Sequence, residues 1–212
     1  MPTEGYILII LSSLTSYLLG SVSTAIVVCK LLGYEDPRSQ GSNNPGATNV
    51  LRIAGKKAAL ITLAGDAIKG VIPILITAFI IKNVFNGLLS TAQIGDILGC
   101  CGIFACLGHL FPIYFKFEGG KGMATSLGVA LTWSWPAGLS IIATWIFIAA
   151  TTRYSSFAAL ISWLFAPIYV GLIQPEYLVY TLLLSCLVIY RHKENIKRLL
   201  SGAENKIGSK SG

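Results

Sequence analysis

"ILIILSSLTSYLLGSVSTAIVVCKLL", residues 7–32, is an apolar run that contains one charged residue, Lys30. A helix of about 17 to 25 apolar residues crosses the roughly 30 Å hydrocarbon core of a bilayer. No Lys or Arg precedes the run and no small-residue cleavage site follows its apolar centre, so we expect a membrane span rather than a removable signal peptide. The whole chain fits this expectation, because 54% of its 212 residues are hydrophobic, only 12% are charged, and its mean hydropathy is +0.70.

Glycines, prolines and charged clusters divide the chain into further apolar segments. The sequence predicts an all-α integral membrane protein with seven transmembrane helices, some of them short, in a single polytopic domain over residues 1–212. A merger of the fourth and fifth segments is the alternative, because 13 residues rise only about 20 Å as a helix. The seven predicted spans lie near residues 6–32, 57–81, 93–115, 122–134, 136–152, 155–173 and 176–190.

The distribution of positive charge favours seven spans over six. With seven, 14 of the 16 basic residues lie on one face, whereas a merger would divide them between both faces. Because cytoplasmic loops carry the excess of Lys and Arg, we expect the amino terminus outside and a cytosolic tail from about residue 191. The residues on the basic face are Lys30, Arg38, Arg52, Lys56, Lys57, Lys116, Lys121, Arg153, Arg191, Lys193, Lys197, Arg198, Lys206 and Lys210.

The five cysteines all fall in apolar runs, without a Cys-x-x-Cys pair or a His at metal-ligand spacing. We interpret them as small core residues, and we expect neither a metal site nor a cofactor. They are Cys29, Cys100, Cys101, Cys106 and Cys186.

Three polar segments fall on the basic face: "GSNNPGATNVLR" (41–52), "GHLFPIYFKFEGGKGMATSLG" (108–128) and "YRHKENIKRLLSGAE" (190–204). In the first, Gly41 and Gly46 permit positive φ, so backbone N–H groups can form an anion-binding nest, and Arg52 adds a planar fork suited to phosphate. An ordinary turn before a helix cap is the alternative. The neutral donors of this segment are Ser42, Asn43, Asn44, Thr48 and Asn49.

In the second segment, "EGGKG" (118–122) opens a span, so free backbone amides and Lys121 can face one anion. It is not a Walker A loop, because Gly122 follows Lys121 where that motif has Ser or Thr. A flexible inter-helix turn is the alternative reading.

In the third segment, His192 and Asn195 are three residues apart and share a face if the segment is helical. His192 can relay a proton near neutral pH, or it can belong to a basic belt that faces the lipid headgroups. Asp66 and Lys69 are ionisable residues inside a span, and we expect them to pair with one another. The position of His109 near the end of the third span favours a structural, hydrogen-bonding role for this residue.

Together these segments resemble the PlsY family of bacterial acyl-phosphate-dependent glycerol-3-phosphate acyltransferases over almost the whole chain, "GDAIKG" (65–70) and "RYSSFAA" (153–159) included. The resemblance implies transfer of a fatty acyl group from acyl phosphate to the 1-hydroxyl of sn-glycerol 3-phosphate, without acyl-CoA, acyl-carrier protein or a cofactor. Catalytic roles are expected for Ser42, Arg52, Lys121, His192 and Asn195. Phosphate or substrate binding is expected for Gly41, Asn44, Gly46, Ala47, Thr48, Asn49, Gly119, Gly120 and Gly122, and structural support for Asp66, Lys69, His109 and Glu204.

The expected partners are the two substrates and membrane lipid, with no nucleic acid, and the expected state is a monomer in the bacterial cytoplasmic (inner) membrane with its site facing the cytosol. Either His192 or a substrate phosphate is expected to take the hydroxyl proton. A membrane transporter of phosphate-bearing anions or lipids is the main alternative function, although the chain lacks the repeated halves typical of many transporters. A scaffold that holds anionic headgroups is the second alternative.

Overall fold

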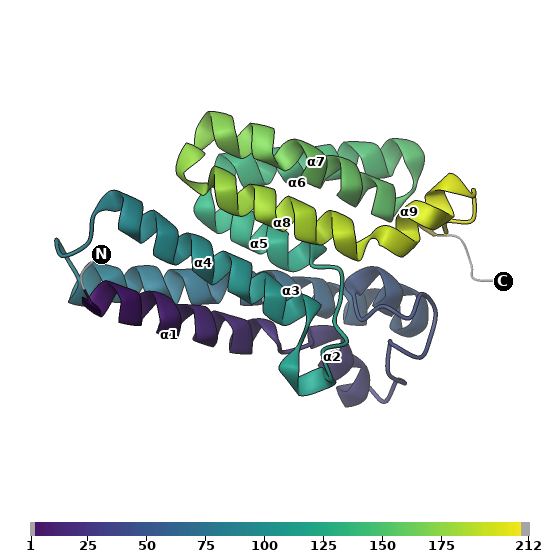
Figure 1. The fold of residues 1–212 in the computed structure, drawn as a ribbon. Helices are drawn as coiled ribbons and strands as arrows, with labels where there is room; N and C mark the ends of the chain where they lie inside the picture. The colour runs from purple at the N-terminus through teal and green to yellow at the C-terminus, as the bar shows by residue number, and fades with distance from the viewer. Residues whose placement is uncertain (1–2, 209–212) are drawn as a thin grey trace.

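The computed structural model describes residues 3–208, and within this range all regular structure is helical (Figure 1). The all-helical prediction is therefore confirmed. The elements are α1 Thr3–Gly20, α2 Thr24–Leu31, α3 Ala47–Val84, α4 Thr91–Leu110, η1 Ile113–Phe115, α5 Met123–Trp133, α6 Trp135–Thr152, α7 Ser155–Ile173, η2 Pro175–Tyr177, α8 Leu178–Arg191 and α9 Lys193–Leu200.

The long helices form two groups that lie against one another (Figure 1). In one group α1 packs along α4 and α3, and in the other α6, α7 and α8 pack together. Helix α5 joins the groups because it contacts both α3 and α6. Apolar side chains from α3 to α8 form one buried core, in which Ile141, Trp163 and Leu184 are fully buried.

Five stretches of the described chain are long and apolar enough to cross a membrane: Thr3–Leu31, Ala47–Val84, Thr91–Phe115, Trp135–Thr152 and Ser155–Ile173. Helices α5 and α8, which correspond to the predicted fourth and seventh spans, have only 11 and 14 residues. Such helices rise about 16 and 21 Å, which is less than the thickness of a hydrocarbon core. The predicted fourth and fifth segments form separate helices, because Ser134 has an extended backbone between α5 and α6.

The predicted first span, 6–32, corresponds to the candidate span Thr3–Leu31, but it is two helices rather than one, because α1 ends at Gly20 and α2 begins at Thr24. At this break the carbonyl of Val22 accepts a hydrogen bond of 2.8 Å from the ammonium of Lys69 on α3. A carbonyl freed from a helix in an apolar environment needs another donor, and a buried lysine supplies it. The break is therefore stabilised by a residue 47 positions away in the sequence.

The predicted second span, 57–81, lies within α3, which begins earlier, at Ala47, and extends to Val84. The helix bends at Gly55, where φ is +80°. Glycine adopts a positive φ without a steric penalty, so it can join the two helical stretches of α3 at this kink. The loop expected over residues 33–56 therefore ends at residue 46.

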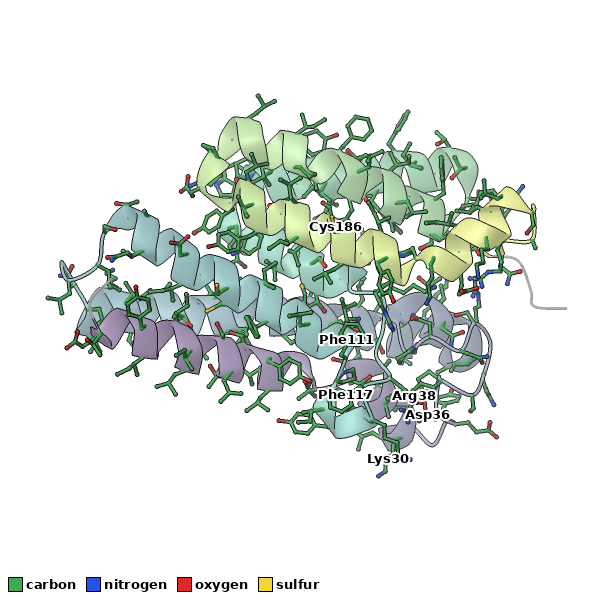
Figure 2. All side chains as sticks on the ribbon, in the orientation of Figure 1. Lys30, Asp36, Arg38, Phe111, Phe117 and Cys186 are labelled. Atoms are coloured by element: carbon green, nitrogen blue, oxygen red, sulfur yellow. The ribbon has the colours of Figure 1, made fainter. Side chains whose placement is uncertain are left out.

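The cysteine prediction is wrong for Cys186, whose side chain is exposed on α8 (Figure 2). The buried face of α8 carries Thr181, Leu184 and Val188, at helical spacing, and Cys186 lies off this face. The other four cysteines are buried or half-buried: Cys29, Cys100, Cys101 and Cys106.

The loop before α3, the loop between α4 and α5 and the tail with α9 gather at the same end of the molecule (Figure 1). The tail is attached to the turn between α6 and α7, because the N–H of Ile207 donates to the carbonyl of Arg153 at 2.7 Å. All three polar segments therefore share one end of the bundle. Lys210, which the charge count also assigns to this end, lies outside the described residues.

Candidate active site

The first polar segment is built around Asn49, whose side chain is buried. Its Oδ1 accepts a hydrogen bond from the N–H of Ser42 at 2.9 Å, and its Nδ2 donates to the carbonyls of Pro37 and Gln40 at 2.8 and 2.9 Å. Gly41 has a φ of +62°, and a Cβ there would lie 2.2 Å from Asn49 Oδ1. Asn49 thus uses both polar atoms of its side chain to shape the loop, and the side chain of Ser42 remains exposed.

The segment continues directly into α3, whose N-cap residue is Gly46. The N–H of Gly46 donates to the carbonyl of Asn44 at 2.9 Å, which closes the turn before the helix. Ala47 and Thr48 occupy the first helical positions, where N–H groups have no partner within the helix and the helix dipole favours negative charge. Arg52 follows about one turn later on the same helix.

The second segment packs tightly on the end of α4. The N–H of Gly120 donates to the carbonyl of His109 at 3.2 Å. A Cβ on Gly120 would lie 2.3 Å from His109 Nε2, and a Cβ on Gly119 would lie 2.1 Å from the His109 carbonyl oxygen. The same Cβ on Gly120 would lie 3.3 Å from the carbonyl oxygen of Pro45, so the first and second segments meet here. Only glycine fits at these two positions without displacing the loop, which continues through Lys121 to the N-cap residue of α5, Gly122.

Arg191, at the end of α8, holds the glycine loop from the third segment. Its Nε donates to the carbonyl of Gly120 at 3.1 Å, and its Nη2 donates to the carbonyl of Gly119 at 2.8 Å. The guanidinium carbon also lies 5.4 Å from the ring centroid of Phe111. Sequence reasoning missed this role, because nothing in a basic stretch indicates that one side chain contacts a loop 71 residues away.

His192 lies between α8 and α9, and its side chain is buried. Its Nδ1 lies 2.7 Å from the carbonyl oxygen of Val188, which can only accept, so Nδ1 carries a proton and donates. In the neutral ring Nε2 is then a free acceptor. Burial is the main cause that lowers the pKa of His192 to about 4; the charges of Lys121 and Arg191 also act to lower it, while the hydrogen bond to Val188 and the charge of Glu204 act to raise it. Val188, rather than Asn195, therefore orients the imidazole, which is neutral at pH 7.

Glu204 joins α7, α9 and the tail. One carboxylate oxygen accepts hydrogen bonds from the Ser156 hydroxyl at 2.6 Å and from Asn195 Nδ2 at 2.7 Å, and the other accepts from Arg198 Nε at 2.7 Å. Burial alone would raise the pKa of Glu204, but these hydrogen bonds bring it below the ordinary value. The amide of Asn195 is thereby fixed, while its buried Oδ1 has no hydrogen-bond partner within residues 3–208.

The charges of all three segments act together on Lys121. Burial is the main cause that lowers its pKa to about 8; the charges of Arg198, Arg52 and Arg191 contribute to this lowering, and the charge of Glu204 opposes it. Arg191 and Arg198 are already engaged by carbonyls and by Glu204. Lys121 and Arg52, by contrast, form no hydrogen bond or ion pair with any residue in the described range. The site therefore contains two cations that are free to hold anionic groups, and the exposed side chain of Ser42 forms no hydrogen bond with a described residue.

A buried ionic network supports the glycine loop from inside the bundle. Lys69 Nζ lies 2.9 Å from Asp66 Oδ1, which confirms the predicted pair, and both side chains are less than 9% exposed. His109 Nδ1 lies 3.7 Å from the same oxygen, and the other side of this ring faces Gly120. The network therefore connects α3 through α4 to the loop.

These features define an all-helical membrane protein. Three chain segments form a cationic site at one end of its helical bundle. The glycerol-3-phosphate acyltransferase family model matches residues 10–202. The chain therefore belongs to the glycerol-3-phosphate acyltransferase family.

Individual relatives agree with this assignment. The glycerol-3-phosphate acyltransferase of Methylococcus capsulatus is 50% identical over 197 residues, which cover 92% of this chain and 94% of the relative. That of Ruthia magnifica is 51% identical over 203 residues, which cover 95% and 98%. The crystal structure of PlsY (YgiH), an integral membrane glycerol 3-phosphate acyltransferase, in its glycerol 3-phosphate form has a TM-score of 0.83 at 37% identity, covering 94% of this chain and 96% of that one. Its lysophosphatidic acid form has a TM-score of 0.82 at 36% identity, with 94% and 95% covered.

Proposed function

We propose that this acyltransferase moves a fatty acyl group from acyl phosphate to the 1-hydroxyl of sn-glycerol 3-phosphate, forming lysophosphatidic acid and phosphate. The observation that carries the proposal is the pair of cations without partners among the described residues, Lys121 and Arg52, beside the glycine loop 119–122. Both proposed substrates carry a phosphate, and the donor carries an apolar chain suited to the membrane-facing surface of the helices. The relatives crystallised with glycerol 3-phosphate and lysophosphatidic acid support the acceptor and the product.

Each phosphate has its own binding groups in this proposal. The amides at the start of α3 and the fork of Arg52 hold one phosphate, because both are donors suited to phosphate oxygens. The N–H of Gly119 and the ammonium of Lys121 hold the acyl phosphate, while the N–H of Gly120 stays bonded to the His109 carbonyl. Arg191 engages the carbonyls of this loop and thereby fixes its position.

The reaction needs no covalent enzyme intermediate, because an acyl phosphate is a mixed anhydride with a good leaving group. The 1-hydroxyl oxygen bonds to the acyl carbon, the bond from that carbon to the phosphate oxygen breaks, and the hydroxyl proton passes to His192 Nε2. Lys121 and the loop amides stabilise the charge on the departing phosphate. Asn195 Oδ1, a fixed and buried acceptor, takes a hydrogen bond from the glycerol and holds it for attack.

His192 becomes a stronger base once the anionic substrates bind. Burial and the neighbouring cations hold its pKa at about 4, and an opposite charge beside the imidazole raises the pKa by stabilising the protonated ring. The proton is then returned to the released phosphate, which is the more basic group at neutral pH.

The activity is tested with purified protein in detergent, acyl phosphate and glycerol 3-phosphate, by measuring lysophosphatidic acid and released phosphate in equal amounts. Product with acyl-CoA but not with acyl phosphate would reject the proposed donor. No product with either donor would favour the transporter of phosphate-bearing anions, which a flux assay in vesicles then tests.

Two further measurements separate the chemical routes. His192→Ala and His192→Gln are both expected to lose most of their turnover; near-normal turnover in folded variants would give the proton to a substrate phosphate instead. Radiolabelled acyl groups retained on the denatured protein would replace direct attack with an acyl-enzyme route, for which Ser42 is the candidate nucleophile.

The proposed topology is seven crossings of the bacterial cytoplasmic membrane by one polytopic domain, with α1 and α2 forming one crossing together. The amino terminus lies outside, and the site and the tail from about residue 191 face the cytosol. After Cys186→Ser removes the exposed thiol, a membrane-impermeant maleimide should label Lys82→Cys in intact spheroplasts but label Lys30→Cys only after permeabilisation. The reverse pattern would invert the topology. Light scattering in detergent tests the proposed monomer.

A further inference from the structure

The turn before the glycine loop is held in an unfavourable conformation. Lys116 and Phe117 have φ values of +57° and +60°, in the left-handed region that residues with a Cβ rarely occupy. Two local hydrogen bonds hold the turn: Phe117 N–H to the Pro112 carbonyl at 2.9 Å, and Glu118 N–H to the Phe115 carbonyl at 3.1 Å. Consecutive strained residues of this kind persist only where the surroundings fix them.

Arg38, from the loop before α3, supplies further contacts on both sides of the strained pair. Its Nη1 donates to the carbonyl of Phe115 at 3.1 Å and to the carboxylate of Glu118 at 3.0 Å. The first contact precedes the strained residues and the second follows them. Arg38 and Phe117 lie at the end of the molecule where the loops gather (Figure 2).

The guanidinium of Arg38 is itself held in place by Asp36. Nε and Nη2 donate to the Asp36 carboxylate at 3.1 and 2.7 Å, and one carboxylate oxygen also accepts the backbone N–H of Arg38 at 2.9 Å. These hydrogen bonds lower the pKa of Asp36 from its ordinary value, so the partner stays ionised. A planar fork can bind Asp36 with one edge and the turn with the other, whereas a lysine ammonium is a point charge that cannot do both.

A shift in this turn cannot be absorbed by the residues that follow. Glu118 is bonded directly to Gly119, and Gly119 and Gly120 already pack against His109 with no space for a Cβ. Arg191 fixes the two glycine carbonyls, and Arg38 fixes the turn that leads into them. The position of the loop amides and of Lys121 therefore depends on an arginine at each end of the segment.

We propose that Arg38 is a positioning residue for the acyl-phosphate half of the site, acting through the turn 115–118. The inference rests on the proposed function, because it assigns the glycine loop to the acyl phosphate. It predicts that loss of Arg38 weakens the binding of one substrate more than the other, which a general loss of folding does not.

The test measures kcat and both KM values for the wild-type protein and for Arg38→Ala and Arg38→Lys. We expect the KM for acyl phosphate to rise about tenfold in both variants, equivalent to about 1.4 kcal/mol. The KM for glycerol 3-phosphate should change less than about twofold, equivalent to less than about 0.4 kcal/mol. Lys30→Ala, which removes an exposed cation on the neighbouring α2, is the matched control and should leave both values unchanged.

A rescue variant tests the role of the strain directly. Glycine adopts positive φ without a steric penalty, and the side chain of Lys116 is exposed, so Lys116→Gly removes strain but little packing. In the Arg38→Ala background, Lys116→Gly should restore the KM for acyl phosphate to within about threefold of wild type, or about 0.7 kcal/mol. Glu118→Gln should have a smaller effect than Arg38→Ala, because the Glu118 side chain is 67% exposed.

Three results would overturn the proposal: an unchanged KM for acyl phosphate in both Arg38 variants, equal changes in both KM values, or no rescue by Lys116→Gly. Failure of the proposed function is a different outcome, since the wild-type protein would then form no product. Arg38→Lys keeps the experiment informative if Arg38→Ala does not fold, because the charge and the stem of the side chain are retained.

Discussion

Lys121 gives the most direct prediction of pH dependence at the site. Its pKa is lowered to about 8, first by burial and then by Arg198, Arg52 and Arg191. A cation with this pKa is about 90% charged at pH 7 and about 10% charged at pH 9. Because the charged form holds the phosphate, kcat/KM for acyl phosphate should be constant below pH 8 and should fall about tenfold for each pH unit well above it.

The substitution Lys121→Arg separates this titration from others, because a guanidinium stays protonated throughout the range. The assay is the pH profile of kcat/KM from pH 6 to 10, with equal ionic strength at each point. We expect the fall above about pH 8 to disappear in Lys121→Arg, even if the value at pH 7 decreases because the fork fits the site differently. Lys30→Arg, at an exposed site, is the control and should keep the wild-type profile.

The kcat profile provides a second check on the same reasoning. A bound phosphate stabilises the ammonium and raises its pKa, so the fall in kcat should lie at higher pH than the fall in kcat/KM. If Lys121→Arg keeps the fall near pH 8, the titrating group is not Lys121. If the falls in kcat and kcat/KM coincide, Lys121 does not contact a substrate phosphate.

Three other substitutions test the support of the site. Gly120→Ala places a Cβ 2.3 Å from His109 Nε2 and should raise the KM for acyl phosphate about tenfold or more, since overpacking costs about 1–3 kcal/mol. Asp66→Asn leaves Lys69 buried without a counterion and should lower the free energy of unfolding by about 3–5 kcal/mol. The melting temperature in detergent should then be about 6–20 °C lower. The double variant Asp66→Asn with Lys69→Met should recover part of this loss. Glu204→Gln should lower kcat about tenfold or more, equivalent to about 1.4 kcal/mol, by releasing the Asn195 amide.

Matched controls exist for two of these substitutions. A Cβ at Gly95 would have its nearest neighbour at 4.0 Å, so Gly95→Ala should leave kinetics and melting temperature unchanged. Glu194→Gln breaks an exposed pair of 3.3 Å with Lys197 on the same helix as Asn195, and should be silent. Equal effects of a variant and its control would contradict the specific contacts assigned to Gly120 and Glu204. A single Asp66→Asn variant as stable as wild type would contradict the ionic pair.

Local residue patterns predicted much of the molecule and several of its residue pairs. Apolar runs of sufficient length identified the long helices, and the three-residue spacing of Asp66 and Lys69 predicted their contact. The break after Gly20 was not predicted, because the apolar run continues through it and its stabilising donor is Lys69 on another helix. The early start of α3 was missed for a related reason, since Asn, Pro and Gly favour a turn but do not show where it ends.

The sequence by itself determined that the chain is helical and of the membrane, which end of each helix carries the cations, and which glycine-rich segments can face phosphate. These properties depend on composition, periodicity and short spacings, which are local. Only the tertiary structure decided which cations are free, because Arg191 and Arg198 are engaged by groups far away in the chain or across a turn, whereas Lys121 and Arg52 are not. It likewise decided that Val188 orients His192 and that Arg38 contacts the turn 77 residues ahead of it, since a side chain's partners depend on which surfaces pack together.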